Sequence, residues 1–177
     1  HSAEAEQAVL GSMLIDPDCI KDVMDKLQPE DFYLRANRDI FETIYHMFIY
    51  SRPIDGVTVA GEMERNGVYN DNTRDYLVQL MDVTPTSANV MEYVKIVLDK
   101  SLMRQVAAAA GSITAMVQEG NGDAGDMLES AEQKVYAIRR GRSAQNMVTV
   151  SMVLQDVMNH LAELTASGGK TLPGLST

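Results

Sequence analysis

The chain has 177 residues, 45% of them hydrophobic, and carries a formal net charge of −10 at neutral pH. No stretch approaches the roughly 20 consecutive apolar residues that cross a bilayer, so we expect no membrane partner. The single cysteine, Cys19, excludes an intramolecular disulfide framework and suits a reducing compartment. Because the first residues are acidic and helical rather than a signal peptide, we expect a cytoplasmic protein.

The charge is unevenly spread along the chain. Residues 1–90 carry 7 lysines and arginines against 16 aspartates and glutamates, whereas residues 91–142 carry 7 of each kind. Proteins that bind nucleic acid hold phosphates with clustered cations. The local basic cluster consists of Lys134, Arg139, Arg140 and Arg142. Cations at such a place also suit the C-terminus of a helix, and we do not expect this chain to grip nucleic acid by itself.

Apolar residues recur with helical spacing along nearly the whole chain, which predicts an all-α fold. Residues 1–87 are expected to form a small globular bundle, with helices at about 3–15, between Asp16-Pro17 and Pro29, and at about 36–51, 59–66 and 75–83. Asp16 is expected to cap its helix, and Gly67 to end another in a left-handed conformation. One face of the first helix is expected to carry Ala5, Ala8, Val9, Ser12 and Met13, and the inner face of the helix at about 36–51 to carry Ile40, Phe41, Ile44, Met47 and Phe48. Met24, Met47 and Met81 are expected to pack in the core.

Residues 88–142 are expected to form a long antiparallel helical hairpin. A helix over about 88–119 is followed by the loop GNGDAG and a shorter return helix over about 126–140. Part of the longer apolar stripe therefore lacks a partner, and such a stripe usually marks an interface with another protein or subunit. The alternative, in which the stripe packs on the bundle, stays open. The apolar residues of the hairpin expected at such an interface are Val94, Val97, Leu98, Leu102, Val106, Ile113, Val117, Leu128, Val135 and Ile138.

Residues 143–177 are expected to be a linker that carries one docking helix at about 150–165. Polar stretches with linker composition flank this helix on both sides. A helix of this length is marginal alone in water, so we expect its apolar face to be covered by another subunit or by chain beyond residue 177. The residues of that face are Val150, Val153, Leu154, Val157, Met158, Leu161 and Leu164.

The segment Gly169-Lys170-Thr171 imitates the end of a phosphate-binding P-loop. The motif G-x-x-x-x-G-K-[ST] requires a glycine where this chain has Leu164. It also requires a strand before it and a helix after it, so that helix N-terminal amides face the phosphate. A helix precedes the segment instead. We therefore expect no nucleotide and no other cofactor to bind this chain.

A catalytic or metal-binding constellation is not expected either. His46 and His160 are isolated histidines, whereas structural zinc normally takes four ligands. Cys19 has no neighbouring cation of the kind that activates nucleophilic cysteines. The many carboxylates suit solvated helix faces and helix caps. We expect the chain to be inactive as an enzyme.

The stretches EAEQAVLGSMLID, PEDFY, NRDIFETI, PIDGVTV, TPTSANVMEYVKIVLDKSLMR, AEQKVYAI and LPGLST occur in this order. Together they resemble the N-terminal domain and linker of DnaB-type bacterial replicative DNA helicases, over essentially the whole chain. The chain departs from the family pattern at Asn37, where histidine is common, at Gly61 within an expected helix, and at the closing LPGLST.

The resemblance implies a hexameric ring that unwinds DNA, with ATP and Mg²⁺ bound by C-terminal ATPase domains. The chain is then expected to be the collar and linker, ending before the ATPase domain. By resemblance, the hairpin forms dimers that assemble into a trimer of dimers, and the linker helix packs on a neighbouring subunit. DNA primase and a helicase loader are the expected partners, and single-stranded DNA is expected to bind only the missing domain. The source is expected to be a bacterium or its phage.

Two alternatives stay open. The helicase-binding C-terminal module of a primase is also a helical bundle that ends in a hairpin, but here a linker helix is expected after the hairpin. An unrelated helical adaptor explains the helical pattern but not the ordered series of stretches.

Overall fold

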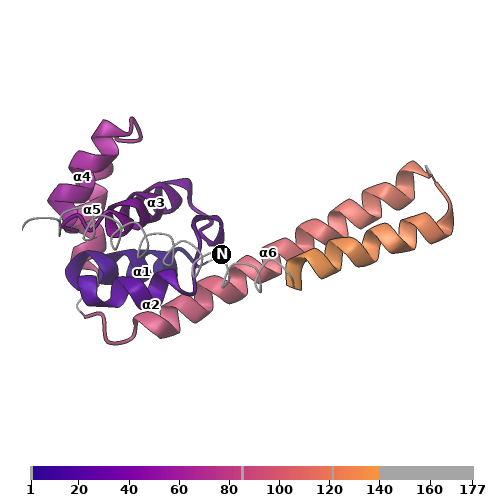
Figure 1. Cartoon of the computed structure of the whole chain (residues 1–177), viewed down its shortest axis with the longest axis horizontal. Coiled ribbons are helices and arrows are strands. Elements are labelled where there is room, and N and C mark those ends of the chain that lie inside the picture. Colours follow the sequence, from indigo (N-terminus) through magenta and orange to yellow (C-terminus); the bar gives the residue numbers. More distant parts are fainter. Residues whose placement is uncertain (1, 85, 121, 140–177) are drawn as a thin grey trace, which may run out of the picture. The chain divides into compact units, whose positions relative to one another are not determined.

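The computed structural model describes residues 2–84, 86–120 and 122–139. Within these ranges the chain is helical and contains no strand, which confirms the all-α prediction (Figure 1). The elements are α1 (Ala3–Ile15), η1 (Pro17–Cys19), α2 (Ile20–Met24), η2 (Pro29–Asp31), α3 (Arg35–Ile49), α4 (Gly56–Arg65), α5 (Thr73–Asp82) and α6 (Val90–Glu119). A last helix, the return helix, covers residues 124–139.

The chain divides into two compact units, His1–Ala131 and Glu132–Thr177. The first unit contains α1 to α6 and the start of the return helix. Of the second unit, the structure describes residues 132–139, the end of the return helix. The boundaries expected from the sequence, after residues 87 and 142, stay a prediction.

α1 lies at the centre of the first unit and packs against α3, α5 and α6. Residues on all its sides are buried: Ala5, Glu6, Val9, Leu10, Gly11, Ser12, Met13 and Leu14. The single apolar face expected from the sequence was therefore too narrow, and Ala8, which was placed on it, is only half-buried. At Gly11 a β-carbon would collide with the Thr84 hydroxyl and the Leu80 carbonyl oxygen. Glycine thus lets α1 approach the end of α5 closely.

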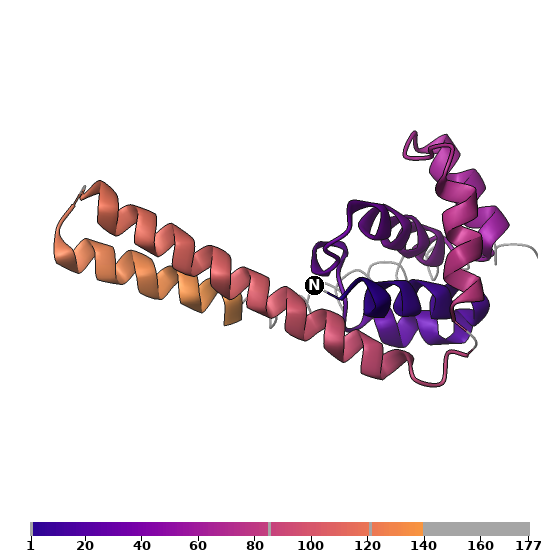
Figure 2. The same ribbon diagram turned by 180° about the vertical axis from the view of Figure 1, so that it is seen from behind.

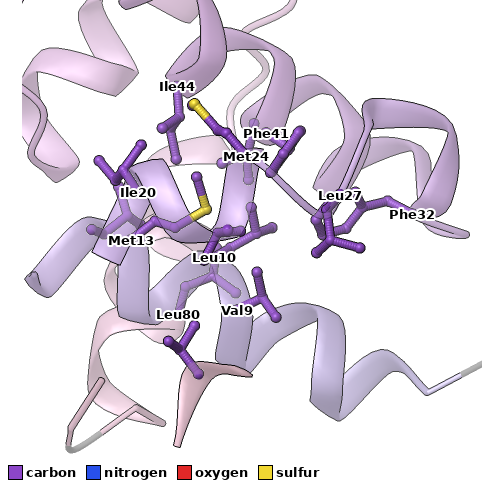
Figure 3. Close-up of a cluster of buried hydrophobic side chains, with 14 of the residues drawn as sticks. Val9, Leu10, Met13, Ile20, Met24, Leu27, Phe32, Phe41, Ile44 and Leu80 are labelled. Carbon is purple, nitrogen blue, oxygen red and sulfur yellow. The ribbon is translucent and has the colours of Figure 1, made fainter. Parts of the chain in front are cut away.

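The core around α1 is built from several short elements (Figure 3). Side chains from four helices and two connecting segments meet there: Val9, Leu10, Met13, Ile20, Met24, Leu27, Phe32, Phe41, Ile44 and Leu80. The rings of Phe32 and Phe41 lie 4.7 Å apart between centroids. Met24 and Met47 are buried as predicted, whereas Met81 is only partly buried against this core.

Two helix ends follow the predicted chemistry. The Asp16 carboxylate accepts a hydrogen bond from the Asp18 amide at 3.2 Å, with Pro17 at the first helical position. The first turn after Asp16 is a 3₁₀ helix, and α2 continues from it. Gly67, which follows α4, has φ +71°, which confirms the predicted left-handed conformation.

α4 begins at Gly56, earlier than the sequence predicted, because Asp55 caps it. The Asp55 carboxylate accepts hydrogen bonds from the amides of Val57 at 2.8 Å and Thr58 at 2.9 Å. The Thr58 hydroxyl in turn accepts one from the Asp55 amide at 2.9 Å, which completes a capping box. The bond from the Thr58 amide is the main cause that lowers the pKa of Asp55 below its usual value.

The first part of α6 belongs to the core of the first unit. Val90, Val94 and Val97 are buried in the same cluster as the apolar residues of α1. Val94 and Val97, each 2% exposed, therefore do not lie on the predicted self-association surface. The physical reason is that α1 needs cover on every side, and the start of α6 covers one of them. For this part of the helix, the alternative that the stripe packs on the bundle is right.

Candidate functional site

Beyond Ser101 no residue of α6 is buried. The helix ends at Glu119, and Gly120 follows it with φ +64°, a left-handed conformation that suits glycine. The chain then reverses, and the beginning of the return helix lies beside the end of α6 (Figures 1 and 2). These two segments form the predicted antiparallel hairpin.

Half-buried residues mark the seam where the two segments meet. They are Ala109, Ile113 and Met116 on α6 and Met127, Ser130 and Ala131 on the return helix. Their spacings of three and four residues are those of one helix face. The seam therefore uses one face of each helix and leaves the other faces uncovered.

An exposed apolar set, the hairpin face, comprises Met103, Val106, Val117 and Leu128, which are 52–63% exposed. At about 100° per residue, the three α6 members centre about 80° from the α6 seam. Leu128 lies about 100° from the seam of the return helix, in the same rotational sense. Because the helices are antiparallel and face each other, equal rotation from the seam turns both sets to one side. The hairpin face therefore takes residues from both helices on one side of the hairpin.

The residues predicted for self-association fall into three groups. Val94 and Val97 are buried in the core, and Leu98 packs partly buried against it. Leu102, Ile113 and Ile138 are half-buried. The exposed members are Val106, Val117, Leu128 and Val135. The role of these four exposed residues in self-association stays a prediction. The docking-helix residues Val150, Val153, Leu154, Val157, Met158, Leu161 and Leu164 lie outside the described residues.

Met103 and Tyr136, 62% and 61% exposed, were missing from the predicted surface. Met103 precedes Val106 by three residues, so it lies on the same helix face. The three-residue spacing between Met103 and Val106 could have placed Met103 on this surface from the sequence alone. Methionine suits such a surface because its flexible side chain adapts to a partner.

A buried polar network joins α1, α3 and α5, and the sequence did not reveal it. Glu6 is only 2% exposed. Its carboxylate accepts hydrogen bonds from the backbone amides of Tyr33 at 2.8 Å and Leu34 at 3.3 Å. It accepts a third from the Asn37 side-chain amide at 2.9 Å. The Tyr76 hydroxyl donates to the Asn37 side-chain oxygen at 2.6 Å. Asn37 thus donates and accepts at once, which suits its place between a carboxylate and a hydroxyl.

Cys19 and His46 are the described residues that the sequence offered as candidates for catalysis or metal binding. Burial, and next the charge of Asp16, raise the pKa of the Cys19 thiol to about 11, so the thiol stays protonated at neutral pH. Within residues 2–84, 86–120 and 122–139, no group of three histidines, cysteines or carboxylates could hold a metal ion. His46 is an exposed residue whose ring lies 4.0 Å from Glu42, one turn away on α3.

Across the same described ranges, no helix is long and apolar enough to cross a membrane. The described residues thus form an all-helical domain that carries exposed apolar residues on its hairpin. A family model described as "DnaB-like helicase N terminal domain" matches residues 1–99. The chain belongs to the family of DnaB-like helicase N-terminal domains.

Curated relatives agree with this family. The replicative DNA helicase DnaB of Mycobacterium leprae is 33% identical over 171 residues, which cover 93% of this chain and 28% of the relative. The Pasteurella multocida DnaB helicase is 30% identical over 182 residues, which cover 100% of this chain and 39% of the relative. The chain thus spans about a third of the length of these relatives. The match also sets aside the primase module and the unrelated adaptor.

Solved structures show the same fold. The N-terminal domain of DnaB helicase from Mycobacterium tuberculosis matches with a TM-score of 0.72 and 34% identity, covering 78% of this chain and 97% of that one. The corresponding domain from Helicobacter pylori matches with a TM-score of 0.58 and 23% identity, covering 65% and 90%. That structure is described together with its interactions with primase.

Proposed function

We propose that the chain is the non-catalytic collar of a hexameric replicative DNA helicase and that it self-associates through the hairpin face. The observation that carries the proposal is the set of exposed apolar residues Met103, Val106, Val117 and Leu128 on one side of the hairpin. Contiguous exposed apolar surface usually marks a protein interface. Assembly into dimers and a trimer of dimers, ATP and Mg²⁺ bound by an ATPase domain, and work in the bacterial cytoplasm belong to the same proposal.

The apolar area of the hairpin face limits the free energy that two copies can gain by pairing. Fully burying one side chain of this kind stabilises by about 1.5–3 kcal/mol, so covering the exposed parts of eight side chains in a pair of copies gives roughly 7–14 kcal/mol. Association costs about 4–15 kcal/mol in lost freedom of motion. The four residues per copy therefore offset this cost only with close packing around them. Ala110, between Val106 and Val117 on the same face, leaves room for close approach.

Sedimentation velocity over a range of concentrations tests self-association. The variant with Val106→Asp and Val117→Asp places two charges on the hairpin face, where burying them unpaired costs several kcal/mol. We expect association to weaken by at least about 100-fold. Because both valines are more than half exposed, the helix content should not change.

A matched control carries Val57→Asp and Val78→Asp, which are exposed valines on α4 and α5. We expect this control to associate like the parent chain. A parent chain that stays monomeric at every concentration would refute self-association. An assembled hairpin variant would show that the interface lies elsewhere.

Recruitment of primase is the second part of the proposal. Its support is the family and the shared fold of the Helicobacter pylori domain, which is described with primase. Isothermal titration of the chain with the C-terminal domain of its cognate primase is expected to give a saturable complex. No heat of binding at high micromolar concentration would remove this part and leave self-association untouched. A helicase loader is proposed as a further partner, and single-stranded DNA as a ligand of the ATPase domain alone.

A further inference from the structure

A polar cluster lies where α6 leaves the globular part of the first unit. Ser101 is the last buried residue of α6, and its hydroxyl donates a hydrogen bond to the Asp31 carboxylate at 2.7 Å. One turn later the Arg104 guanidinium donates to the Asp31 backbone carbonyl at 2.6 Å. The guanidinium also lies 5.6 Å from the centre of the Tyr33 ring. We name Asp31, Ser101 and Arg104 the clamp.

The globular part holds Asp31 in place independently of α6. The second carboxylate oxygen of Asp31 accepts a hydrogen bond from the Gln28 amide at 2.9 Å, which closes η2. The next residue, Phe32, is fully buried and packs on Phe41 of α3. The Phe32 carbonyl accepts a hydrogen bond from Arg38 of α3 at 3.1 Å. Asp31 is thus held in a fixed position, and α6 binds to it through Ser101 and Arg104.

Two of the bonds in the clamp are of the stronger kinds. The bond from Ser101 ends on a carboxylate, and the bond from Arg104 starts from a guanidinium, so each is charge-assisted. The residue Asp31 is 8% exposed, and the low local dielectric strengthens both bonds. A second guanidinium nitrogen of Arg104 is buried and finds no acceptor in the part of the chain that the structure describes.

The clamp doubles the length over which α6 is anchored. The buried valines from Val90 to Val97 anchor about 10 Å of helix, and continuing to Arg104 extends this to about 21 Å. The free part of α6, from Arg104 to Glu119, is about 22 Å long. A swing of 10° about the end of the anchor then moves the tip by about 4 Å. The last anchoring contacts therefore control the position of the tip.

We propose that the clamp is a positioning device that fixes the direction in which α6 projects from the globular part. Val90, Val94 and Val97 hold the start of the helix, and the clamp removes the remaining freedom to swing. One consequence rests on the assembly proposed above. In that assembly, the direction of α6 sets how far apart two paired copies hold their globular parts. The clamp itself is a property of one chain.

The distance between spin labels on the globular part and at the tip of α6 tests the proposal. Labels are attached at Glu64→Cys on α4 and Gln118→Cys on α6, both exposed, after Cys19→Ser. Labelled protein is diluted into an excess of unlabelled chain, so that only distances within one copy are read. The clamp variant carries Ser101→Ala and Arg104→Met, which removes both donors but keeps an unbranched, flexible side chain at residue 104.

We expect the clamp variant to broaden the distance distribution by about 4 Å for each 10° of added swing. Lys95→Met, at an exposed lysine on the packed part of α6, is the matched control and should leave the distribution unchanged. Circular dichroism should show equal helix content in all three proteins. If the clamp variant fails to fold, Ser101→Ala alone takes its place and is judged by the same broadening.

An unchanged distribution in a folded clamp variant would overturn the proposal, because the valines would then suffice to fix the direction. Equal broadening in the Lys95→Met control would overturn it as well. These outcomes are separate from the test of self-association. A monomeric chain can still show the clamp, and an assembled chain can still lack it.

Discussion

Replacing Glu6 by glutamine tests whether the buried carboxylate stabilises the bundle. One Glu6 oxygen accepts from the Tyr33 amide, and the other accepts from Leu34 and Asn37. Glutamine has one acceptor oxygen and one NH₂ donor group. With its oxygen toward the Tyr33 amide, its NH₂ group faces the donors of Leu34 and Asn37, so donor meets donor. The side chain of Asn37 can turn round, but the Leu34 amide stays without an acceptor.

The magnitude follows from this count. A buried donor left without an acceptor costs about 1–3 kcal/mol, and hydrogen bonds to a charged group contribute about 1.5–3 kcal/mol. Because the contributions overlap, we expect Glu6→Gln to lower the free energy of unfolding by about 2–4 kcal/mol. In a chain of this size, that lowers the melting temperature by about 4–16 °C.

Thermal and urea unfolding followed by circular dichroism at 222 nm give both quantities. The matched control is Glu4→Gln, an exposed residue in the same helix turn, and we expect it to stay within about 0.5 kcal/mol of the parent. Equal stability of the Glu6 and Glu4 variants would refute the reasoning. Tyr76→Phe removes the other donor to Asn37, and a double-mutant cycle with Glu6→Gln should show a coupling of about 0.5–3 kcal/mol.

Two further predictions concern glycine and a helix cap. Gly11→Ala should destabilise by about 1–3 kcal/mol, because its β-carbon meets the Thr84 hydroxyl and the Leu80 carbonyl. In contrast, Gly61→Ala should stabilise by up to about 1 kcal/mol, because its β-carbon meets nothing within 4 Å. Urea unfolding measures both, and a Gly11→Ala variant as stable as the parent would contradict the packing described for α1. Since the folded pKa of Asp55 is lowered, its charge stabilises the fold above the ordinary value of 3.8, and this contribution fades as the pH falls through the folded pKa. The difference in unfolding free energy between the parent and Asp55→Asn should therefore be larger at neutral pH than near about pH 3, and a constant difference would argue against the cap.

The helices and their order were predictable because their apolar residues repeat at helical spacing. α3 is an example: of the five residues that the sequence placed on its inner face, Ile40, Phe41, Ile44 and Met47 are buried, and Phe48 is 38% exposed. Where a helix started early, as α4 did, a polar cap had set the boundary rather than the apolar pattern. Capping depends on single side chains, which periodicity does not register.

The buried network escaped prediction for a different reason. Glu4 and Glu6 stand two residues apart in the same acidic helix start, yet one is exposed and the other is 2% exposed. The difference arises from the amides of Tyr33 and Leu34, which reach Glu6 only in the folded chain. Asn37 was the clue, since it stands three residues before Ile40 on the buried face of α3. A polar side chain at such a place needs a partner.

The apolar stripe of α6 passes from the core to the exposed surface within one unbroken helix. The spacing of the apolar residues alone does not predict the residue at which this change occurs. Val97 packs in the core, whereas Val106 is 52% exposed nine residues later. Two polar residues, Ser101 and Arg104, stand at the change, and both bind Asp31. Their presence on the helix face of Val94 and Val97 has a physical cause, since a helix that leaves a core needs a last contact that water does not loosen. No glycine or proline interrupts α6 between Val90 and Ala110, so this part of the helix is expected to be straight and stiff. A partner bound at the proposed hairpin face would therefore act on the same helix that completes the core around α1 and carries the clamp.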